Sequence, residues 1–275
     1  MEVKACCAAA YQRDVVALVL GDSYHPGGLA LTRLLARRLG LMAGQRVLDV
    51  ASGPGSTALM LARELEVSVV GVDLGEAAVA TASEAARSAG LGASVSFQLA
   101  DAERLPFPDA SFDAVICECA LCTFPNKIRA AAELARVLRP GGRVGITDVT
   151  VEPDRLNMKL RGLAGWVACL ADARPARGYA DILTSAGLVV TRTEDHDSAL
   201  GEMIEAIETR LRALRLLAGN LPALSGVDFD ETLAMTELAA RAVAQGHAGY
   251  TLLIAEKPQP PSQTPRYQWT TNTQS

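Results

Sequence analysis

Three of the chain's six cysteines lie within six positions, in the segment VICECALCTFPNK at residues 115–127. Cys119 and Cys122 have the C-x2-C spacing of structural zinc sites, but a closed zinc site needs four ligands. The sequence offers no second C-x2-C pair and no H-x3-H pair to complete the set. Thiolates also select soft metal ions and metalloids, so these cysteines are candidate ligands for soft chemistry. Cys117 lies inside a strand-like run and is interpreted as packing.

A second candidate site lies in the segment VLDVASGPGS at residues 47–56. It places Asp49 in a strand, directly before a turn that contains Gly53 and Gly55. A strand, a glycine turn and a helix let a ligand approach backbone N–H groups at the start of the helix. A dinucleotide fingerprint would have a third glycine where this sequence has Ala58. The motif therefore favours a nucleoside cofactor without a pyrophosphate.

Two further carboxylates end the next strand-like runs. Asp73 comes some 20 residues after the glycine turn, where a carboxylate can accept hydrogen bonds from both hydroxyls of a ribose. Asp101 ends the following run, where a carboxylate can accept from an exocyclic amine. The alternative is that the glycine turn is purely structural and that the acids cap turns or are solvated.

The elements that must position these residues alternate along the chain. This alternation predicts an α/β fold with a mostly parallel sheet covered by helices on both faces. Strands are expected at 45–52, 67–73, 94–100, 112–118, 143–150, 188–196 and 249–258. Helices are expected at 56–66, 75–90, 126–142, 155–173, 178–187, 200–219 and 230–246.

Three regions are predicted from this pattern. Residues 1–40 are expected to form an N-terminal helical cap. Residues 41–258 are expected to form the main domain, with a helical insertion at 197–248. The polar, proline-rich segment 259–275 is predicted to be a disordered tail.

Composition restricts the class of protein and its partners. Hydrophobic residues make up 49 % of the 275 residues, which is enough to bury a large core. The net charge of −5 argues against a nucleic-acid partner, and no apolar run reaches the roughly 18 residues of a membrane span. The first residues lack the apolar core of a signal peptide. We therefore expect a cytoplasmic protein with reduced thiols, no nucleic-acid partner and no membrane partner; the oligomeric state is left open.

Over about residues 40–150 the sequence resembles class I S-adenosylmethionine-dependent methyltransferases. The segments LPFPDASFDAV (105–115) and ELARVLRPGGRVGITD (133–148) are close to the family's own. The resemblance implies a Rossmann-like seven-stranded sheet, with residues 249–258 as the last strand, and S-adenosylmethionine as cofactor. It implies that the methionine end is held by the Ser52–Gly55 loop and Asp49, the ribose by Asp73, and the adenine by Asp101 and the Ala102 backbone. The further cofactor-contacting positions that it implies are Leu74 and Cys117.

A narrower resemblance is to arsenite methyltransferases, which carry one cysteine after the fourth strand and a second after the fifth. Cys119 matches the first, and Cys169 in WVACLADAR matches the second. VKACCAAA (3–10) is similar to that family's N-terminal Cys-Cys segment, but LGDSYHPGG (20–28) lacks the cysteine expected there. The resemblance implies that Cys119 and Cys169 hold trivalent arsenic as the methyl acceptor and that a thiol acts as reductant. A third sulfur would come from one of three residues, Cys122, Cys6 or Cys7.

Two other functions remain open from the sequence. One is a methyltransferase for a small organic acceptor, in which the cysteines only line the pocket and the base is Glu118, His25 or Tyr179. The other is a non-catalytic metal- or metalloid-binding protein. The complete set of three carboxylates in the cofactor motifs argues against it, because such a protein needs no cofactor pocket. In the expected cap, Tyr24 or His25 could contact the methionine carboxylate, or His25 could merely precede Pro26 in a turn.

Overall fold

The computed structural model describes residues 14–21, 24–161, 169–217, 224 and 226–260. The described residues form a seven-stranded sheet in the order β3-β2-β1-β4-β5-β7-β6. β7 is antiparallel to both of its neighbours, and the pairs formed by β1 to β5 are parallel. The strands are β1 (Arg46–Val50), β2 (Ser68–Asp73), β3 (Val95–Leu99), β4 (Phe112–Glu118), β5 (Leu138–Val151), β6 (Val189–Asp195) and β7 (Ala248–Glu256). This topology confirms the predicted Rossmann-like α/β fold.

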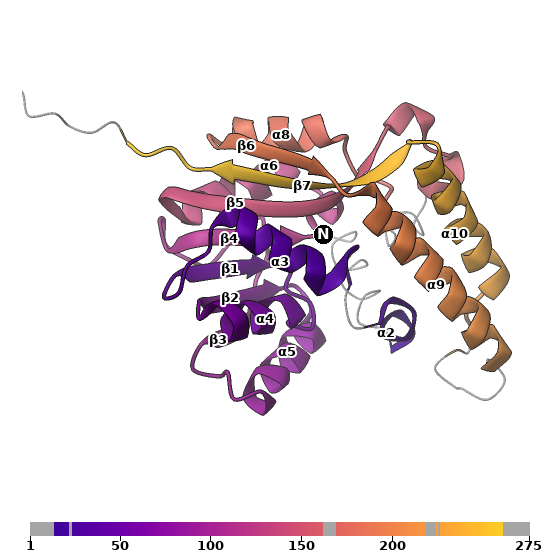
Figure 1. The fold of residues 1–275 in the computed structure, drawn as a ribbon, viewed down its shortest axis with the longest axis horizontal. Coiled ribbons are helices and arrows are strands. Elements are labelled where there is room, and N and C mark those ends of the chain that lie inside the picture. Colours follow the sequence, from indigo (N-terminus) through magenta and orange to yellow (C-terminus); the bar gives the residue numbers. More distant parts are fainter. Residues whose placement is uncertain (1–13, 22–23, 162–168, 218–223, 225, 261–275) are drawn as a thin grey trace, which may run out of the picture.

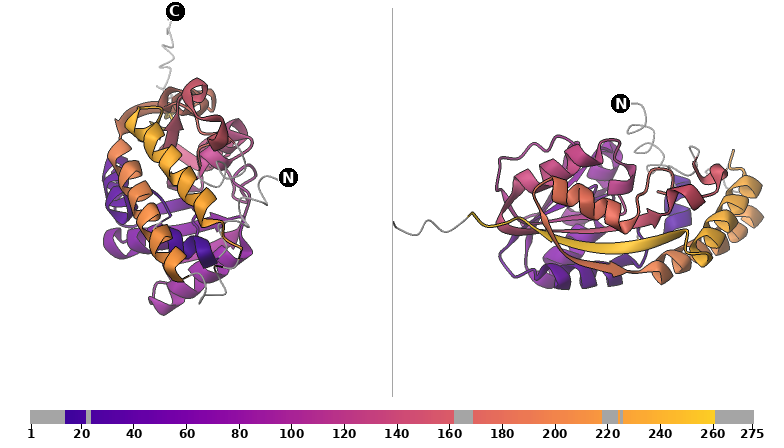
Figure 2. Two further views of the ribbon diagram at one scale, coloured as in Figure 1. Left: turned by 90° about the vertical axis from the view of Figure 1, so that its right-hand side faces the viewer. Right: turned by 90° about the horizontal axis from the view of Figure 1, so that it is seen from above.

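Helices cover both faces of this sheet (Figures 1 and 2). α3 (Gly28–Leu39), α4 (Ser56–Leu65) and α5 (Glu76–Ser88) pack on one face, and α6 (Lys127–Val137) and α8 (Ala176–Ser185) on the other. The remaining α-helices with described bounds are α2 (Asp14–Leu20), α9 (Asp197–Leu217) and α10 (Phe229–Ala244). Short 3-10 helices lie at Leu121–Thr123, Pro153–Arg155 and Met158–Arg161.

The core lies between the sheet and its two helical layers. β1, β4 and β7 are apolar and buried along almost their whole length, as expected for strands covered on both faces. α3 approaches β5 closely at Gly145, where an added Cβ atom would lie 2.8 Å from the Leu35 side chain. The lack of a side chain on Gly145 therefore lets α3, which the sequence assigned to a cap, pack directly on the sheet.

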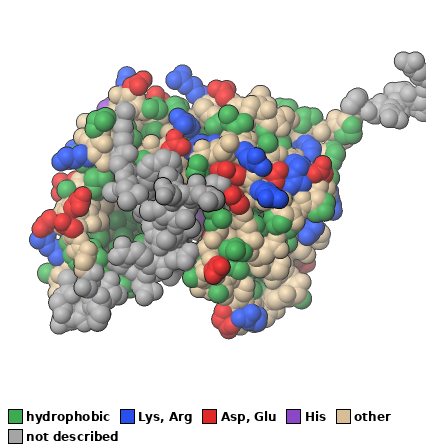
Figure 3. Space-filling view, turned by 180° about the vertical axis from the view of Figure 1, so that it is seen from behind, with side chains coloured by type: hydrophobic (Ala, Val, Ile, Leu, Met, Phe, Trp, Pro, Cys, Tyr) green, Lys and Arg blue, Asp and Glu red, His purple; other side chains and the backbone are tan. Residues whose placement is uncertain are grey.

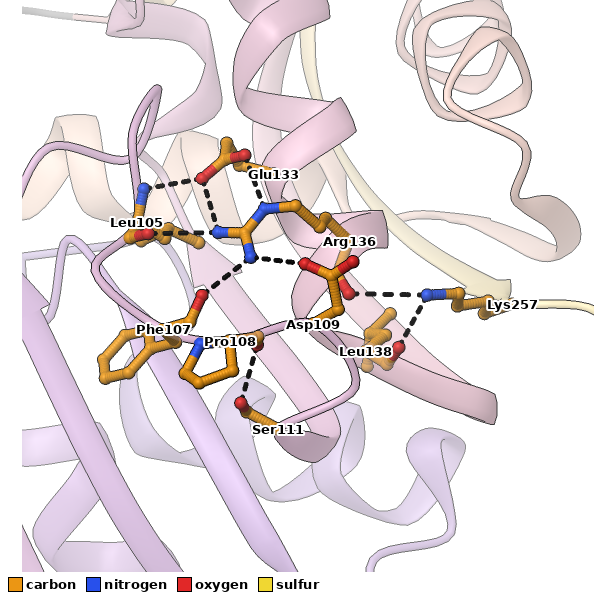
Figure 4. Close-up of polar contacts among 9 residues, drawn as sticks. All are labelled: Leu105, Phe107, Pro108, Asp109, Ser111, Glu133, Arg136, Leu138 and Lys257. Atoms are coloured by element: carbon orange, nitrogen blue, oxygen red, sulfur yellow. Dashed lines mark hydrogen bonds and ion pairs between the residues drawn. The ribbon is translucent and has the colours of Figure 1, made fainter.

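The Arg136 guanidinium group helps to fix the loop between β3 and β4 to α6 (Figure 4). Arg136 donates to the carbonyl oxygens of Leu105 and Phe107 and to the carboxylates of Asp109 and Glu133. Lys257, beyond β7, donates to the carbonyl oxygens of Arg136 and Leu138. The two segments that carried the family resemblance are thus joined in space, which fixes the loop that follows the end of β3.

Helices α9 and α10 stand beyond the C-terminal ends of the parallel strands (Figure 1). Arg210 of α9 donates to the carbonyl oxygens of Val19 and Leu20 in α2, so α2 is held against α9. A separate apolar cluster supports this region, formed by Leu211, Leu224, Phe229 and Leu233. The two elements thus stand beside the strand ends where a ligand is expected.

The charges on the surface and the lengths of the helices are relevant to nucleic-acid and membrane partners. Figure 3 shows acidic and basic side chains interspersed on the face seen from behind. Among the helices of the described ranges, none is both long and apolar enough to cross a membrane.

Two of the predicted helices are wrong in extent. The helix expected at 126–142 ends at Val137, because β5 already begins at Leu138 and pairs there with Phe112 of β4. The helix expected at 155–173 is absent from its described part, which forms two short 3-10 helices and, at 169–173, no helix. The apolar residues Leu156 and Leu160 of this segment are nevertheless buried. Residues 162–168, the Cys6–Cys7 pair and most of the predicted tail lie outside the described residues.

Candidate active site

The glycine turn after β1 forms the first wall of the site. Ser52 donates its backbone N–H to the Val72 carbonyl oxygen of β2, and Gly55, the N-cap residue directly before α4, has φ of 87°. An added Cβ atom at Gly55 would lie 2.6 Å from the Phe97 ring, so glycine is required both by the left-handed backbone and by this close approach. The turn is therefore fixed against β2 and β3 at the point where α4 begins.

Asp73 organises the turn from the neighbouring strand. Its Oδ2 accepts from the Gly53 N–H at 2.9 Å and its Oδ1 from the Gly75 N–H at 2.8 Å. Each carboxylate oxygen has a second lone pair, so both can still accept from a ligand. Gly53 and Asp73 are thus hydrogen-bonded, and Asp49 and Ser52 belong to the same group through the pairing of β1 and the turn with β2.

The other predicted cofactor positions follow β2 and β3. Leu74 is 40 % exposed, which leaves an apolar surface available beside Asp73. Asp101 accepts from the Glu103 N–H at 2.9 Å, and Ala102 is buried. Cys117 is fully buried inside β4, which supports its interpretation as packing.

Two buried polar atoms in this group have no protein partner. Asp49 is 3 % exposed, and its Oδ2 and the Ser52 Oγ make no hydrogen bond. Burial, followed by the charges of Glu118 and Asp73, raises the pKa of Asp49 well above its ordinary value. Such atoms in native proteins call for a partner, and a cluster of carboxylates favours a cation. A cofactor with a sulfonium and an ammonium group meets both requirements.

Glu118, at the end of β4, connects this group to α3 and α4. Its side chain is 4 % exposed and accepts from the Thr57 hydroxyl at 2.7 Å and the Thr32 hydroxyl at 3.1 Å. The His25 Nε2 lies 3.6 Å from its Oε2. His25 thus contacts a carboxylate of the protein itself. The sequence named Glu118 and His25 but gave no signal for Thr32 or Thr57, which meet them only in the folded chain.

Cys119 and Cys169 meet across two loops. Their sulfur atoms lie 3.9 Å apart, although one residue follows β4 and the other precedes α8. Both have left-handed backbones, with φ of 50° at Cys119 and 62° at Cys169. Left-handed conformations are strained in residues other than glycine, asparagine and aspartate, and persist where the surrounding structure imposes them. The fold therefore holds two strained cysteines with their thiols in contact.

The third cysteine of this region lies beside the pair. The Cys122 N–H donates to the Asp148 carboxylate at 2.9 Å. Burial first, then contact with the Cys169 thiol, raises the pKa of Cys122 well above its ordinary value. At Cys119, contact with Cys169 is the larger cause of a raised pKa and burial the second. All three thiols are therefore close to one another, and Cys119 and Cys122 are protonated at neutral pH.

No closed metal site is formed by these groups. Within the part of the chain that the structure describes, no set of three or more His, Cys, Asp or Glu side chains is arranged to hold a metal ion. An ion with metal–sulfur bonds of about 2.3 Å, as zinc makes, would hold two sulfurs about 3.5–3.8 Å apart. The separation of Cys119 and Cys169 is close to that value, so the pair is a two-sulfur arrangement to which a third donor has to be added.

A buried tyrosine and a buried carboxylate complete the surroundings. Asp148 is fully buried and accepts from the N–H groups of Cys122 and Val149. The Tyr179 hydroxyl donates to the Val149 carbonyl and accepts from the Arg174 N–H, so this buried side chain is not placed to act as a base. Asp148 was missed from the sequence, although an acid near a strand end was the signal used for Asp73.

Comparison with known proteins agrees with this geometry. The family model described as "Methyltransferase domain" matches residues 48–146. Methyltransferase GfsG of Streptomyces halstedii is 40 % identical over 130 residues, which cover 47 % of this chain and 47 % of that protein. The 27-O-demethylrifamycin SV methyltransferase of Amycolatopsis mediterranei is 31 % identical over 233 residues, which cover 83 % of both. The chain thus spans about half of the first relative and most of the second.

Solved structures share the fold. The [4+2]-cyclase SpnF superposes with a TM-score of 0.72 at 26 % identity, covering 92 % of this chain and 96 % of that one. A phosphoethanolamine N-methyltransferase 2 of Haemonchus contortus, in complex with S-adenosylhomocysteine, has a TM-score of 0.76 at 22 % identity. That match covers 92 % of this chain and 57 % of the other. From the sequence relatives and the shared fold, we conclude that the chain belongs to the class I S-adenosylmethionine-dependent methyltransferases and uses S-adenosylmethionine as its cofactor.

Proposed function

We propose that this methyltransferase methylates trivalent arsenic, presented as arsenite and held by the thiol groups of Cys119 and Cys169. The observation that carries the proposal is the sulfur–sulfur contact of 3.9 Å between two cysteines from separate loops. One of these cysteines directly follows β4, at the edge of the sheet where parallel α/β folds bind their ligands. The pair therefore stands on the same edge as the cofactor group formed by Asp49, Ser52 and Asp73.

Backbone strain at both cysteines supports a functional role. A cysteine that only fills space has no need of a left-handed backbone, because the same volume can be packed in a relaxed conformation. Strain of this kind costs roughly 1–3 kcal/mol at each residue and clusters at functional sites. Cys117, the packing cysteine of the same strand, has no such backbone.

The chemistry suits thiols with raised pKa values. Each thiol can replace a hydroxide of arsenous acid, forming an arsenic–sulfur bond and releasing one water. Because the thiol proton leaves in that water, no free thiolate has to form in the buried site. The arsenic keeps its lone pair, which has no proton to lose, so methylation at that lone pair needs no general base. Proximity and orientation are then the main contributions of the protein.

The cofactor supplies an electrophilic methyl group on a sulfonium. Asp49, Ser52 and the turn at Gly53 would hold its methionine end, and Asp73 would accept from its ribose hydroxyls. Leu74, Asp101 and Ala102 would flank the adenine. Methylation at the lone pair oxidises arsenic formally from +3 to +5, and a thiol reductant would return it to +3.

A third sulfur is best supplied by Cys122. The neighbouring thiol of Cys169 contributes to its raised pKa, which places the two side chains next to each other. The rival donors Cys6 and Cys7 lie outside the described residues. A small shift of Cys122 would give the pyramidal three-sulfur environment that trivalent arsenic favours.

The test is product analysis by mass spectrometry with arsenite, S-adenosylmethionine and a thiol. The wild-type protein and the Cys117→Ser control should form methylated arsenicals. The Cys119→Ser and Cys169→Ser variants should form none while they still bind the cofactor, because a hydroxyl is a hard ligand. Undiminished arsenic methylation by the Cys119→Ser, Cys169→Ser double variant would contradict the proposal.

A small organic acceptor is the second candidate, favoured by the contact between His25 and Glu118 and by the organic substrates named for the relatives. In that case His25, positioned by Glu118, would take a proton from the acceptor. The His25→Ala variant separates the two proposals. It should leave arsenic methylation within about threefold of wild type, whereas loss of a general base typically costs about 100-fold or more.

A further inference from the structure

Lys127 occupies a position that local rules disfavour. It is the first residue of α6, where the helix dipole disfavours a positive charge, and its side chain is only 5 % exposed. The first turn of α6 carries no acidic residue to compensate. A residue that is unfavourable for its own helix position, as Lys127 is, is expected where a tertiary contact or a function requires it.

The tertiary contact is an ion pair with Asp172. The Lys127 Nζ donates to the Asp172 Oδ2 at 2.5 Å and to the Phe124 carbonyl oxygen at 3.0 Å. It therefore closes the loop that follows β4 and at the same time reaches the loop that precedes α8. These are the two loops that carry Cys119 and Cys169.

Asp172 is itself fixed on the far side. Its Oδ1 accepts from the Arg174 guanidinium at 2.8 Å. The backbone of Arg174 bonds to Val151 at the end of β5 and to the Tyr179 hydroxyl in α8. The ion pair thus joins two anchored segments rather than two free side chains.

We infer that the Lys127–Asp172 ion pair is a positioning device that holds Cys169 against Cys119 and so sets the geometry of the two-sulfur site. The inference rests on the proposed function for its purpose, but its geometric content concerns the two thiols alone. If the ion pair were merely structural, its removal would change the melting temperature without changing how readily these two thiols form a disulfide or bind one arsenical.

The experiment measures the pairing of the thiols in the full chain without arsenic. Oxidised glutathione accepts the two thiol hydrogens and becomes two molecules of reduced glutathione, while Cys119 and Cys169 form a disulfide. The equilibrium constant of this exchange, read by peptide mapping, gives the effective concentration of one thiol at the other. Binding of phenylarsine oxide, which bridges two thiols, is the second readout, and cofactor affinity by calorimetry is the control.

Lys127→Met keeps an unbranched side chain that is one atom shorter and removes the charge. It should lower the pairing constant and the phenylarsine oxide affinity at least tenfold, and Lys127→Arg should recover most of the loss. Lys257→Met is the control, because that lysine also donates to backbone carbonyl oxygens but follows Glu256, which pairs with Arg143 at the end of the sheet opposite to the two loops. Lys257→Met should leave both readouts unchanged, and cofactor affinity should stay within twofold in all variants.

An unchanged pairing constant in Lys127→Met would overturn the inference, even if that variant melts at a lower temperature. Should Lys127→Met fail to fold, Asp172→Asn removes the same charge pair from the more exposed partner and should show the same loss. Strong thiol pairing in the wild type without any arsenical binding would refute the proposed function and leave the positioning role intact. Absence of pairing in the wild type would refute the positioning role.

Discussion

Cys119 offers a test of whether strain is stored at the two-sulfur site. Replacing it by alanine or by glycine removes the thiol in both cases, but only glycine adopts φ of 50° without a steric penalty. A Cβ atom costs about 1–2 kcal/mol in the left-handed region, and glycine loses about 0.5–1 kcal/mol more backbone entropy on folding. Cys119→Gly should therefore be about 0.5–1 kcal/mol more stable than Cys119→Ala.

That difference is measurable by scanning calorimetry. For a domain of this size it corresponds to a melting temperature about 1–4 °C higher in the glycine variant. Ala110 provides the matched control, because it has φ of 55° in an exposed turn away from the site. Ala110→Gly should stabilise by a similar amount and retain activity, whereas both Cys119 variants should be inactive. If Ala110→Gly stabilises but Cys119→Gly melts no higher than Cys119→Ala, no strain is stored at Cys119 and the argument from its backbone is wrong.

Three further predictions concern the cofactor and the effect of pH. Asp73→Ala should weaken S-adenosylmethionine binding by about 1.5–3 kcal/mol, the usual loss for hydrogen bonds to a charged group. Calorimetric titration measures this affinity, and an unchanged value would show that Asp73 does not bind the ribose. Burial raises the pKa of Asp148 to about 7 from 3.8, so its contribution to stability is full below about pH 4 and is lost as pH rises through about 7. The stability lost through this titration is at most about 4 kcal/mol. The melting temperature of the ligand-free wild type should therefore fall more steeply between about pH 5 and pH 8 than that of Asp148→Asn. Equal slopes of melting temperature against pH in the two proteins would show that another group titrates. Arsenite affinity should change less than about threefold from about pH 6.5 to about pH 8, because the thiol protons leave as water. Cd²⁺ affinity should rise at least about tenfold over the same range, because Cd²⁺ displaces protons from thiols. If equilibrium dialysis gives the same pH dependence for both ions, the proposed exchange of thiol for hydroxide is contradicted.

The sequence predicted the parts of the site that follow from local pattern. Asp49 and Asp73 could be placed because carboxyl ends of parallel strands meet at one edge of a sheet, and the structure brings both to the glycine turn. The position of Cys119 directly after β4 was predicted from the same rule. The end of α6 was not, because its chain passes directly into β5, whose first residue pairs with β4.

Contacts between distant segments could not be predicted. The Thr32–Glu118 hydrogen bond joins residues 86 positions apart, and the Lys127–Asp172 ion pair joins residues 45 positions apart. Neither follows from hydrophobic period, capping or turn chemistry, and the buried lysine contradicts local preference. The meeting of Cys119 with Cys169 was implied only by a family resemblance, and the structure places their sulfur atoms in contact.

The most direct test of the account is X-ray absorption at the arsenic edge, on the full chain loaded with one equivalent of arsenite in the presence of S-adenosylhomocysteine. We expect a first shell with at least two sulfur atoms in the wild type, and three if Cys122 joins Cys119 and Cys169. The same spectrum should revert to oxygen ligands in the Cys119→Ser, Cys169→Ser double variant and remain unchanged in Cys117→Ser. A first shell of oxygen alone in the wild type, or a sulfur shell that survives in the double variant, would contradict the claim that these two cysteines hold the methyl acceptor.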